Sequence, residues 1–340
     1  MAQSNNSIPV LVTGGAGYIG SHVVWALSDA GYRVVVLDDL SSGRREALPA
    51  SARLIVGDVG NPSLVESLIR DNAIGAVMHF AGSVLVAQSV EDPLGYYANN
   101  TLKSHALITA SIAAGVKSFI FSSTAAVYGA PVVQPIMESA PTAPINPYGA
   151  SKLMTEIMLR DAAAASGLNY VILRYFNVAG ADPAGRTGER RPTATHLINV
   201  ATQVALGRRR VLSIFGEDYD TPDGTCIRDY IHVSDLADAH VRALGHLARG
   251  GASQTLNCGY GRGVSVREVI DKIGEISGWR VPTQSAPRRP GDPPVLVAAV
   301  DRLRSVLDWR PRHDDLGVII GTALAWEQHL TGINPHRATA

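Results

Sequence analysis

Two side chains four residues apart, Tyr148 and Lys152, are the best suited in this sequence to move a proton. Residues at that spacing lie on one face of a helix, so the phenol and the ammonium can enter one cleft. A free tyrosine loses its proton near pH ~10, and a neighbouring cation favours the phenolate. We therefore expect a general base with a charged partner. A tyrosine packed at a helix start beside a solvated lysine would give the same spacing, so the surrounding elements must decide.

The segment before this pair supports the chemical interpretation. An apolar run over residues 118–121 is typical of a buried strand, and it ends in Ser122, Ser123 and Thr124. Together with the start of the chain, these residues predict a hydride-transfer site with a proton relay.

The start of the chain carries a dinucleotide fingerprint. From residue 8 an apolar run leads into Gly14, Gly17 and Gly20, and an amphipathic segment follows to about residue 31. Glycines allow the tight turn, and the backbone amides at the helix start can bind a pyrophosphate. Asp38 ends the next apolar run, where an acid about 20 residues beyond the glycines accepts both ribose hydroxyls and repels a 2′-phosphate. We expect NAD rather than NADP.

Strand and helix patterns continue to alternate, which predicts an α/β fold with a Rossmann-like doubly wound parallel sheet of about seven strands. We expect strands at residues 33–37, 54–56, 76–80 and 170–173, and helices at 62–71, 93–114 and 148–166. The expected domains are residues 8–177 for NAD, with a later segment of about 225–260 returning to them, and mainly residues 178–330 as a smaller C-terminal α/β substrate domain. Asp58 and Val59 follow one strand, where Asp58 could alternatively cap the next helix.

The second half holds two charged segments that could bind a nucleotide sugar. Residues 181–195 resemble a loop, and Arg228 and Asp229 lie in a later turn. Arg289 and Asp292 lie in a proline-rich loop. Arginine forks suit a diphosphate and a carboxylate suits ribose hydroxyls, although clusters of this kind are often only surface charges.

The composition excludes several classes of function. Thirty Lys and Arg balance thirty Asp and Glu, so binding to nucleic acid or to an anionic membrane is not expected. The two cysteines, Cys226 and Cys258, have neither disulfide-framework nor metal-ligand spacing, so we expect no metal and a cytoplasmic protein. The first seven residues lack a secretory pattern, and we expect a frayed tail there.

Taken together, the chain resembles the extended short-chain dehydrogenase/reductase family, and within it the UDP-sugar 4-epimerases. The resemblance runs from about residue 8 to 330 through VTGGAGYIGSH, HFAG, PLGYYANN, FSSTAAVYG, PYGASK, LRYFNVAGA, GTCIRDYIHVSDLADAH and APRRPGDPP. It implies interconversion of UDP-glucose and UDP-galactose by inversion at C4, through a 4-keto intermediate and with tightly bound NAD. The implied catalytic residues are Thr124, Tyr148 and Lys152.

The resemblance also implies two sets of binding residues. For the cofactor they are Gly14, Gly17, Tyr18, Ile19, Gly20, Asp38, Asp58, Val59, Phe80, Ala81, Gly82, Asn99, Ser122, Tyr148, Lys152 and Phe176. For the UDP-sugar substrate they are Thr124, Tyr148, Asn177, His196, Leu197, Ser213, Phe215, Arg228, Arg289, Asp292 and Leu296.

The chain departs from the family pattern at two places: the first removes a charge near the cofactor, and the second leaves the sugar preference open. Ser83 and Val84 stand where many members have a lysine, and Leu296 stands where members have tyrosine or cysteine beside the sugar. A 4-epimerase for UDP-xylose and UDP-arabinose or for UDP-N-acetylhexosamines is therefore an alternative, and a catalytically silent NAD-binding regulator is a more distant one. Family members pair through the two helices over residues 93–114 and 148–166, so we expect a homodimer. Apolar outer positions there are Leu102, Met154, Ile157 and Met158.

Overall fold

A parallel sheet of seven strands forms the centre of the computed structural model, which describes residues 8–191, 195–289 and 291–332. The strand order is β11-β6-β5-β4-β1-β2-β3. The strands are β1 Val10–Thr13, β2 Val34–Asp38, β3 Arg53–Val56, β4 Ala76–His79, β5 Ser118–Thr124, β6 Asn169–Tyr175 and β11 Gln254–Cys258. This confirms the predicted Rossmann-like sheet. The expected frayed tail, residues 1–7, and the tip of the expected substrate loop, residues 192–194, lie outside the described residues.

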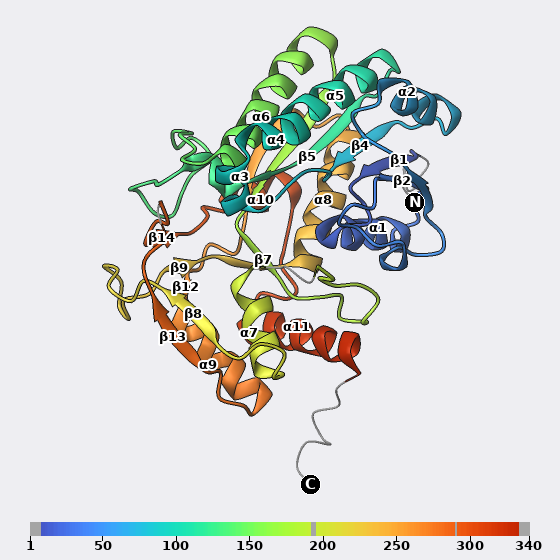
Figure 1. Cartoon of the computed structure of the whole chain (residues 1–340). Helices are drawn as coiled ribbons and strands as arrows, with labels where there is room; N and C mark the ends of the chain where they lie inside the picture. Colours follow the sequence, from blue (N-terminus) through green and yellow to red (C-terminus); the bar gives the residue numbers. More distant parts are fainter. Residues whose placement is uncertain (1–7, 192–194, 290, 333–340) are drawn as a thin grey trace.

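Helices cover both faces of the sheet (Figure 1). One face packs against α1, Tyr18–Asp29, and α8, Val233–Ala248; the other packs against α2, Pro62–Asp71, α5, Lys103–Ala113, and α6, Pro147–Ser166. Side chains alternate along β1, so Val10 and Val12 enter the first layer while Leu11 enters the second. Burial on both faces explains why the strands are continuous apolar runs rather than alternating ones.

Local signals set several helix boundaries. The α2 helix covers the predicted residues because Asn61 accepts a hydrogen bond from Leu64 N and Pro62 occupies the first helical position. The α9 helix, Val266–Ser277, begins with a capping box between Ser265 and Glu268.

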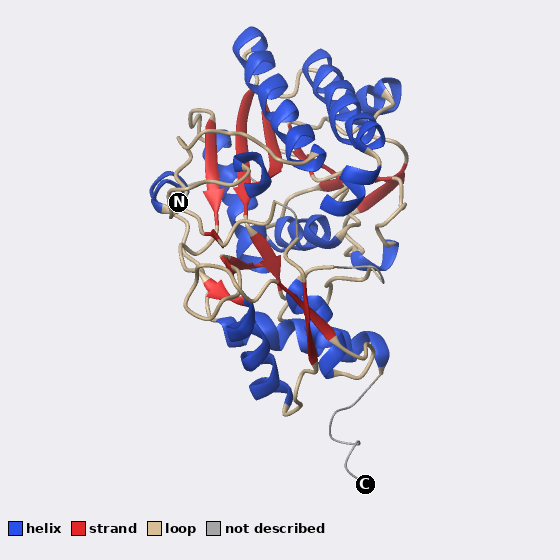
Figure 2. Ribbon diagram, turned by 60° about the vertical axis from the view of Figure 1, so that its left-hand side comes forward, coloured by secondary structure: helices blue, strands red, loops and turns tan. Residues whose placement is uncertain are grey.

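The later part of the chain forms a smaller group of helices and short strands, which lies below the sheet in Figure 1 and is seen from another side in Figure 2. It contains α7 Leu197–Ala205, β8 Leu212–Phe215, α9, β13 Thr283–Ala286 and α11 Leu316–Thr331. Short strands connect it to the sheet: β7 Asn177–Ala179, β9 Ile227–Arg228, β10 Tyr230–His232, β12 Val264–Ser265 and β14 Val295–Leu296. The remaining helices are η1 Arg45–Ala47, α3 Val86–Glu91, η3 Ala125–Tyr128 and α10 Asp301–Leu307. None of the described helices is long and apolar enough to cross a bilayer.

The prediction of a single continuous α-helix over residues 93–114 is wrong in detail. It consists of α4 Pro93–Tyr96, a π-helical segment η2 Tyr97–Leu102, and α5. The wider turn of η2 brings Asn99 and Asn100 to the backbone and side chain of Ser83, which follows β4. The cause is a tertiary contact, which the local sequence pattern does not contain.

Candidate active site

The α6 helix brings Tyr148 and Lys152 to the carboxyl end of the sheet. Asn146 caps the helix by accepting a hydrogen bond of 2.8 Å from Gly149 N, and Pro147 begins it. Both side chains are buried, at 7% and 4% exposure. The predicted strand before them extends three residues further, and its last residue is Thr124.

Lys152 contacts the end of β5. Its Nζ donates a hydrogen bond of 3.0 Å to Ser122 O and lies 4.9 Å from the centre of the Phe121 ring. Burial lowers the pKa of Lys152 to about 8, and the charge of Glu156, one helical turn further along α6, opposes that shift. The ammonium is therefore still mostly protonated at neutral pH.

Thr124 influences the ionisation of Tyr148. Burial of the phenol raises its pKa above the ordinary value, while the Thr124 side chain acts in the opposite direction. The expectation that Lys152 brings this pKa down is not met in the structure, because desolvation is the larger effect and the ammonium is directed to Ser122 O. The Thr124 Oγ1 also accepts a hydrogen bond of 3.1 Å from Ala126 N, which fixes the hydroxyl.

The glycine turn between β1 and α1 has the features of a dinucleotide cradle. Gly14 has a φ of +69°, and a Cβ there would lie 2.5 Å from Ala81 N. A Cβ on Gly20 would lie 2.2 Å from Gly14 O, so the turn closes directly onto the helix. No side chain caps the α1 N-terminus, whose first residues are Tyr18 and Ile19. The backbone amides there are available to an anionic group such as the NAD pyrophosphate, so the residues fit that cofactor.

Asp38 ends β2 beside this turn. Its carboxylate is 7% exposed and accepts hydrogen bonds of 2.9 Å from Ala16 N and Leu40 N. Burial raises its pKa, and these two amides oppose the rise. Arg44 and Arg45, in the segment after β2, are exposed to solvent. A fixed carboxylate at this position fits ribose hydroxyls and disfavours a 2′-phosphate.

Asp58 lies after β3, with Val59 buried beside it. Its carboxylate forms an ion pair with Lys103 Nζ and accepts a hydrogen bond from Gly60 N, each at 2.8 Å. The alternative interpretation of Asp58 as a helix cap is wrong, because Asn61 caps α2.

The residues after β4 form the opposite side of the cradle. Gly82 lies against the Asn100 side chain, whose Oδ1 accepts a hydrogen bond of 2.7 Å from Ser83 N. Asn99 donates to the Ser83 hydroxyl at 2.9 Å. Phe80 and Ala81 precede this turn and pack against the two core layers. Ser83 thus holds η2 against the end of β4.

The expected substrate residues fall into two groups. Arg228 and Asp292 form an ion pair with each other, and the Arg289 guanidinium stacks 3.9 Å from the centre of the Phe215 ring. Leu296 pairs in register with Arg228 between β14 and β9. Ser213, on β8, accepts a hydrogen bond of 3.0 Å from Gln284 Nε2.

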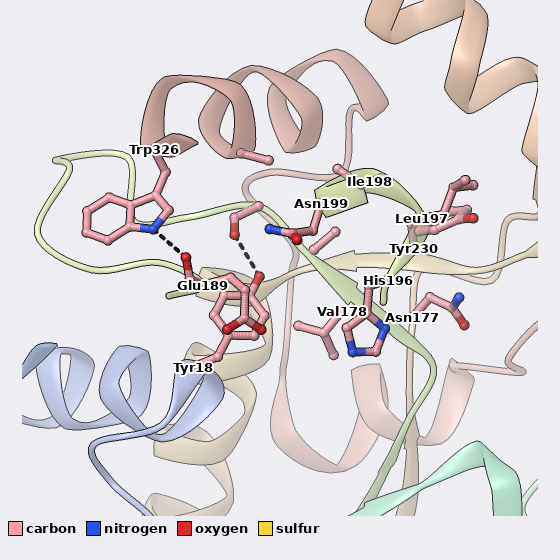
Figure 3. Close-up of a pocket in the computed structure, with 13 residues that line it drawn as sticks. Tyr18, Asn177, Val178, Glu189, His196, Leu197, Ile198, Asn199, Tyr230 and Trp326 are labelled. Carbon is pink, nitrogen blue, oxygen red and sulfur yellow. Dashed lines mark hydrogen bonds between the residues drawn. The ribbon is translucent and has the colours of Figure 1, made fainter. Parts of the chain in front are cut away.

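The second group lines a pocket between α1, β7 and α7 (Figure 3). Asn177, His196 and Leu197 lie on one side of it, and Tyr18 lies across from them, with its hydroxyl donating to Gly180 O at 2.6 Å. Phe176, the residue before Asn177, is buried in a small apolar cluster next to Thr124.

A buried network behind the catalytic helix was not predicted. Glu156 accepts two hydrogen bonds from the Arg174 guanidinium, of 2.9 and 2.6 Å, and one of 2.6 Å from Ser123 Oγ. Arg174 also donates to the Tyr128 hydroxyl at 2.9 Å. The four-residue spacing from Lys152 to Glu156 could have indicated that this acid faces the core, but its partner on β6 could not be read from spacing.

Comparisons with known proteins agree with this geometry. Residues 10–259 match the NAD dependent epimerase/dehydratase family. The chain is 65% identical to the UDP-glucose 4-epimerase of Azospirillum brasilense over 96% of its own length and 94% of the relative. It also resembles the solved UDP-glucose 4-epimerase of Brucella ovis in complex with NAD, with 46% identity, a TM-score of 0.91, and coverage of 94% of this chain and 98% of that one.

A further solved relative is the UDP-glucose 4-epimerase of Stenotrophomonas maltophila with bound NAD and formylated UDP-arabinopyranose. It is 39% identical, with a TM-score of 0.93, and the match covers 96% of this chain and 99% of that one. The chain therefore belongs to the NAD-dependent epimerase/dehydratase family.

Proposed function

We propose that this chain interconverts UDP-glucose and UDP-galactose by inverting C4 of the hexose, with NAD as its bound cofactor. The observation that supports this most strongly is the joint burial of Thr124, Tyr148 and Lys152 at the carboxyl end of the sheet, beside a turn that fits a pyrophosphate. The relative from Azospirillum brasilense is named for this reaction.

The proton steps belong to Tyr148 and Thr124. Tyr148 accepts the proton of the sugar 4-hydroxyl while C4 becomes a ketone, and it returns the proton when C4 is reduced from the other face. Thr124, whose side chain favours the ionised form of Tyr148, holds the same oxygen through its hydroxyl. When bound, NAD supplies a hydride acceptor and then a hydride donor, so the reaction has no net redox change.

Lys152 provides the charge that this chemistry requires. Burial makes the phenolate of Tyr148 unfavourable, so a compensating cation must lie nearby. The ammonium of Lys152 is held at Ser122 O, one turn of α6 from the tyrosine, and Glu156 supports its protonated form. This ammonium would also hold the ribose next to the nicotinamide when NAD is bound.

The UDP part binds on the other side of the site. Arg228 and Arg289 carry the charges that suit a diphosphate, and the Phe215 ring offers a stacking surface. The proposed remaining contacts are Asn177, His196, Leu197, Ser213, Asp292 and Leu296. If UDP is bound tightly while the sugar makes few contacts, the 4-keto sugar can rotate in the site and present its other face to the cofactor.

We also infer a homodimer in the cytoplasm, with residues 8–177 and about 225–260 as the NAD domain and most of 178–330 as the substrate domain. Leu102 is 66% exposed and Ile157 is 44% exposed on neighbouring elements, η2 and α6. Met158 instead packs against the inner layer of the sheet, so Ile157 is the better outer position for pairing. Both cysteines are buried and free, as a reducing compartment permits.

The test is turnover by purified protein without added NAD. UDP-galactose, UDP-xylose and UDP-N-acetylgalactosamine are supplied in parallel, and products are separated by chromatography. Conversion of UDP-galactose to UDP-glucose as the fastest reaction is the expected result. Faster conversion of either other sugar would move the enzyme to that substrate, and bound NAD with no turnover of any sugar would leave a silent NAD-binding protein.

A further inference from the structure

Leu296 lies in a short segment that is held from both sides. On one side the segment pairs with β9, where Ile227 N donates to Pro294 O at 2.8 Å and Asp229 N donates to Leu296 O at 3.1 Å. On the other side it meets the proline-rich loop before α6. There Ile136 N donates to Val297 O and Ala299 N donates to Ile136 O, each at 2.8 Å.

The side chain of Gln134 completes this second contact. Its Nε2 donates a hydrogen bond of 3.1 Å to Val295 O, and its Oε1 accepts one of 3.0 Å from Val297 N. These two backbone groups flank Leu296 on either side. The primary amide therefore takes the place of a peptide group in a neighbouring strand, with one donor and one acceptor at the required positions.

Leu296 itself lies close to the reacting end of the site. Its side chain packs against an apolar cluster that contains Ala125, which follows Thr124, and Phe176, which precedes Asn177. It also stands opposite Arg228 in the β9–β14 pair. A shift of the 295–297 backbone would therefore move an apolar wall relative to Thr124 and Arg228 together.

We propose that Gln134 is a positioning residue for sugar selectivity, which fixes Leu296 as a wall of the sugar site by clamping Val295 and Val297. This inference rests on the proposed function. Gln134 is half-buried in a loop, and the segment keeps its bonds to β9 and Ile136 without it. Loss of the amide should therefore free Leu296 locally while the chain still folds.

The first test compares Gln134→Ala with Gln254→Ala, a half-buried glutamine whose one side-chain partner is Arg302, at the edge of the sheet. The loss of two neutral hydrogen bonds sets the upper size of the effect. We expect the ratio of kcat/KM for UDP-galactose to that for UDP-N-acetylgalactosamine to fall about fivefold in Gln134→Ala, mainly through KM, and to be unchanged in Gln254→Ala. Gln134→Glu keeps only the acceptor for Val297 N and should give an intermediate ratio.

A second measurement separates positioning from general loosening. Amide hydrogen exchange at Val297 should speed up in Gln134→Ala but not in Gln254→Ala. In a Leu296→Ala background, Gln134→Ala should change the selectivity ratio no further, because its effect acts through that side chain. Unchanged exchange at Val297, or an equal selectivity effect with and without Leu296, would overturn the inference. A wild-type protein inactive on every UDP-sugar would instead refute the proposed function, whereas the exchange result decides the clamp whatever the activity.

Discussion

The buried ion pair between Glu156 and Arg174 offers a sharp test of how the catalytic helix is held. Glu156 is fully buried on α6 and Arg174 is 2% exposed on β6. The guanidinium donates to both carboxylate oxygens, and Ser123 of β5 donates to one of them. The pair therefore fixes α6, which carries Tyr148 and Lys152, to the two strands beneath it.

Replacing Glu156 by Gln should destabilise the fold strongly. Arg174 would be left as a buried charge without its counter-ion, which costs about 3–5 kcal/mol. An unfolding entropy of about 2 cal/mol/K per residue gives about 0.7 kcal/mol/K for a chain of 340 residues, so the Tm should fall by about 4–7 °C. The loss of a negative charge should also lower the pKa of Lys152 below about 8, because Glu156 supports its protonated form. Activity that requires the ammonium should then decline at lower pH than in the wild type.

Thermal unfolding and the pH profile of kcat measure the two effects separately. The matched control is Glu66→Gln, which removes an exposed pair with Arg70 and should change stability by less than about 1 kcal/mol. A double variant, Glu156→Leu with Arg174→Met, removes both charges and should recover much of the loss. Two results would contradict the role of the ion pair in fixing α6: a melting temperature of Glu156→Gln within about 1 °C of the wild type, or an unchanged pH at which kcat declines on the alkaline side.

Three further predictions follow from the same structure. Burial lowers the pKa of His79 to about 3, so this histidine is neutral in the fold, whereas the unfolded chain binds a proton below pH 6.5. The free energy of unfolding should therefore decrease as the pH falls from 6.5 towards 3, and this histidine should contribute about 2 kcal/mol of that decrease at pH 5. Urea unfolding of His79→Gln should show a correspondingly weaker dependence of stability on pH. Asp38→Asn should weaken NAD binding roughly 10–100-fold through the loss of charge-assisted hydrogen bonds, so the purified variant should contain little NAD; full occupancy would count against its ribose role. Ile157→Glu should give a monomer by light scattering, with a melting temperature that no longer depends on protein concentration, and an unchanged mass would exclude that face as the interface.

Much of the fold could be predicted because its signals are local. Residues 62–71 carry their own cap and an N-terminal proline, so this helix has the expected bounds, and residues 266–277 begin with a capping box of the same local kind. Parallel strands buried on both faces are read directly from apolar runs. The spacing of Tyr148 and Lys152 likewise indicates one helix face, which is the buried face in the structure.

The rest depends on contacts between segments far apart in the chain. The π-helical segment forms because Asn99 and Asn100 bind Ser83, and no local pattern announces it. Arg228 and Asp292, expected as separate ligands, form an ion pair because β9 and β14 lie side by side. The raised pKa of Tyr148 could not be inferred from the spacing to Lys152, because burial of the phenol sets its direction and the ammonium is directed to Ser122 O.

The central claim is that Tyr148 moves the proton in an epimerisation with bound NAD, and one variant tests it directly. Tyr148→Phe removes only the hydroxyl, and Tyr170→Phe, half-buried at the start of β6, is the matched control. Turnover of UDP-galactose, bound NAD and UDP affinity should be measured on both proteins. We predict that Tyr148→Phe loses at least about 100-fold in kcat while it keeps NAD and UDP, and that Tyr170→Phe keeps all three. Near-normal turnover by Tyr148→Phe would contradict the claim.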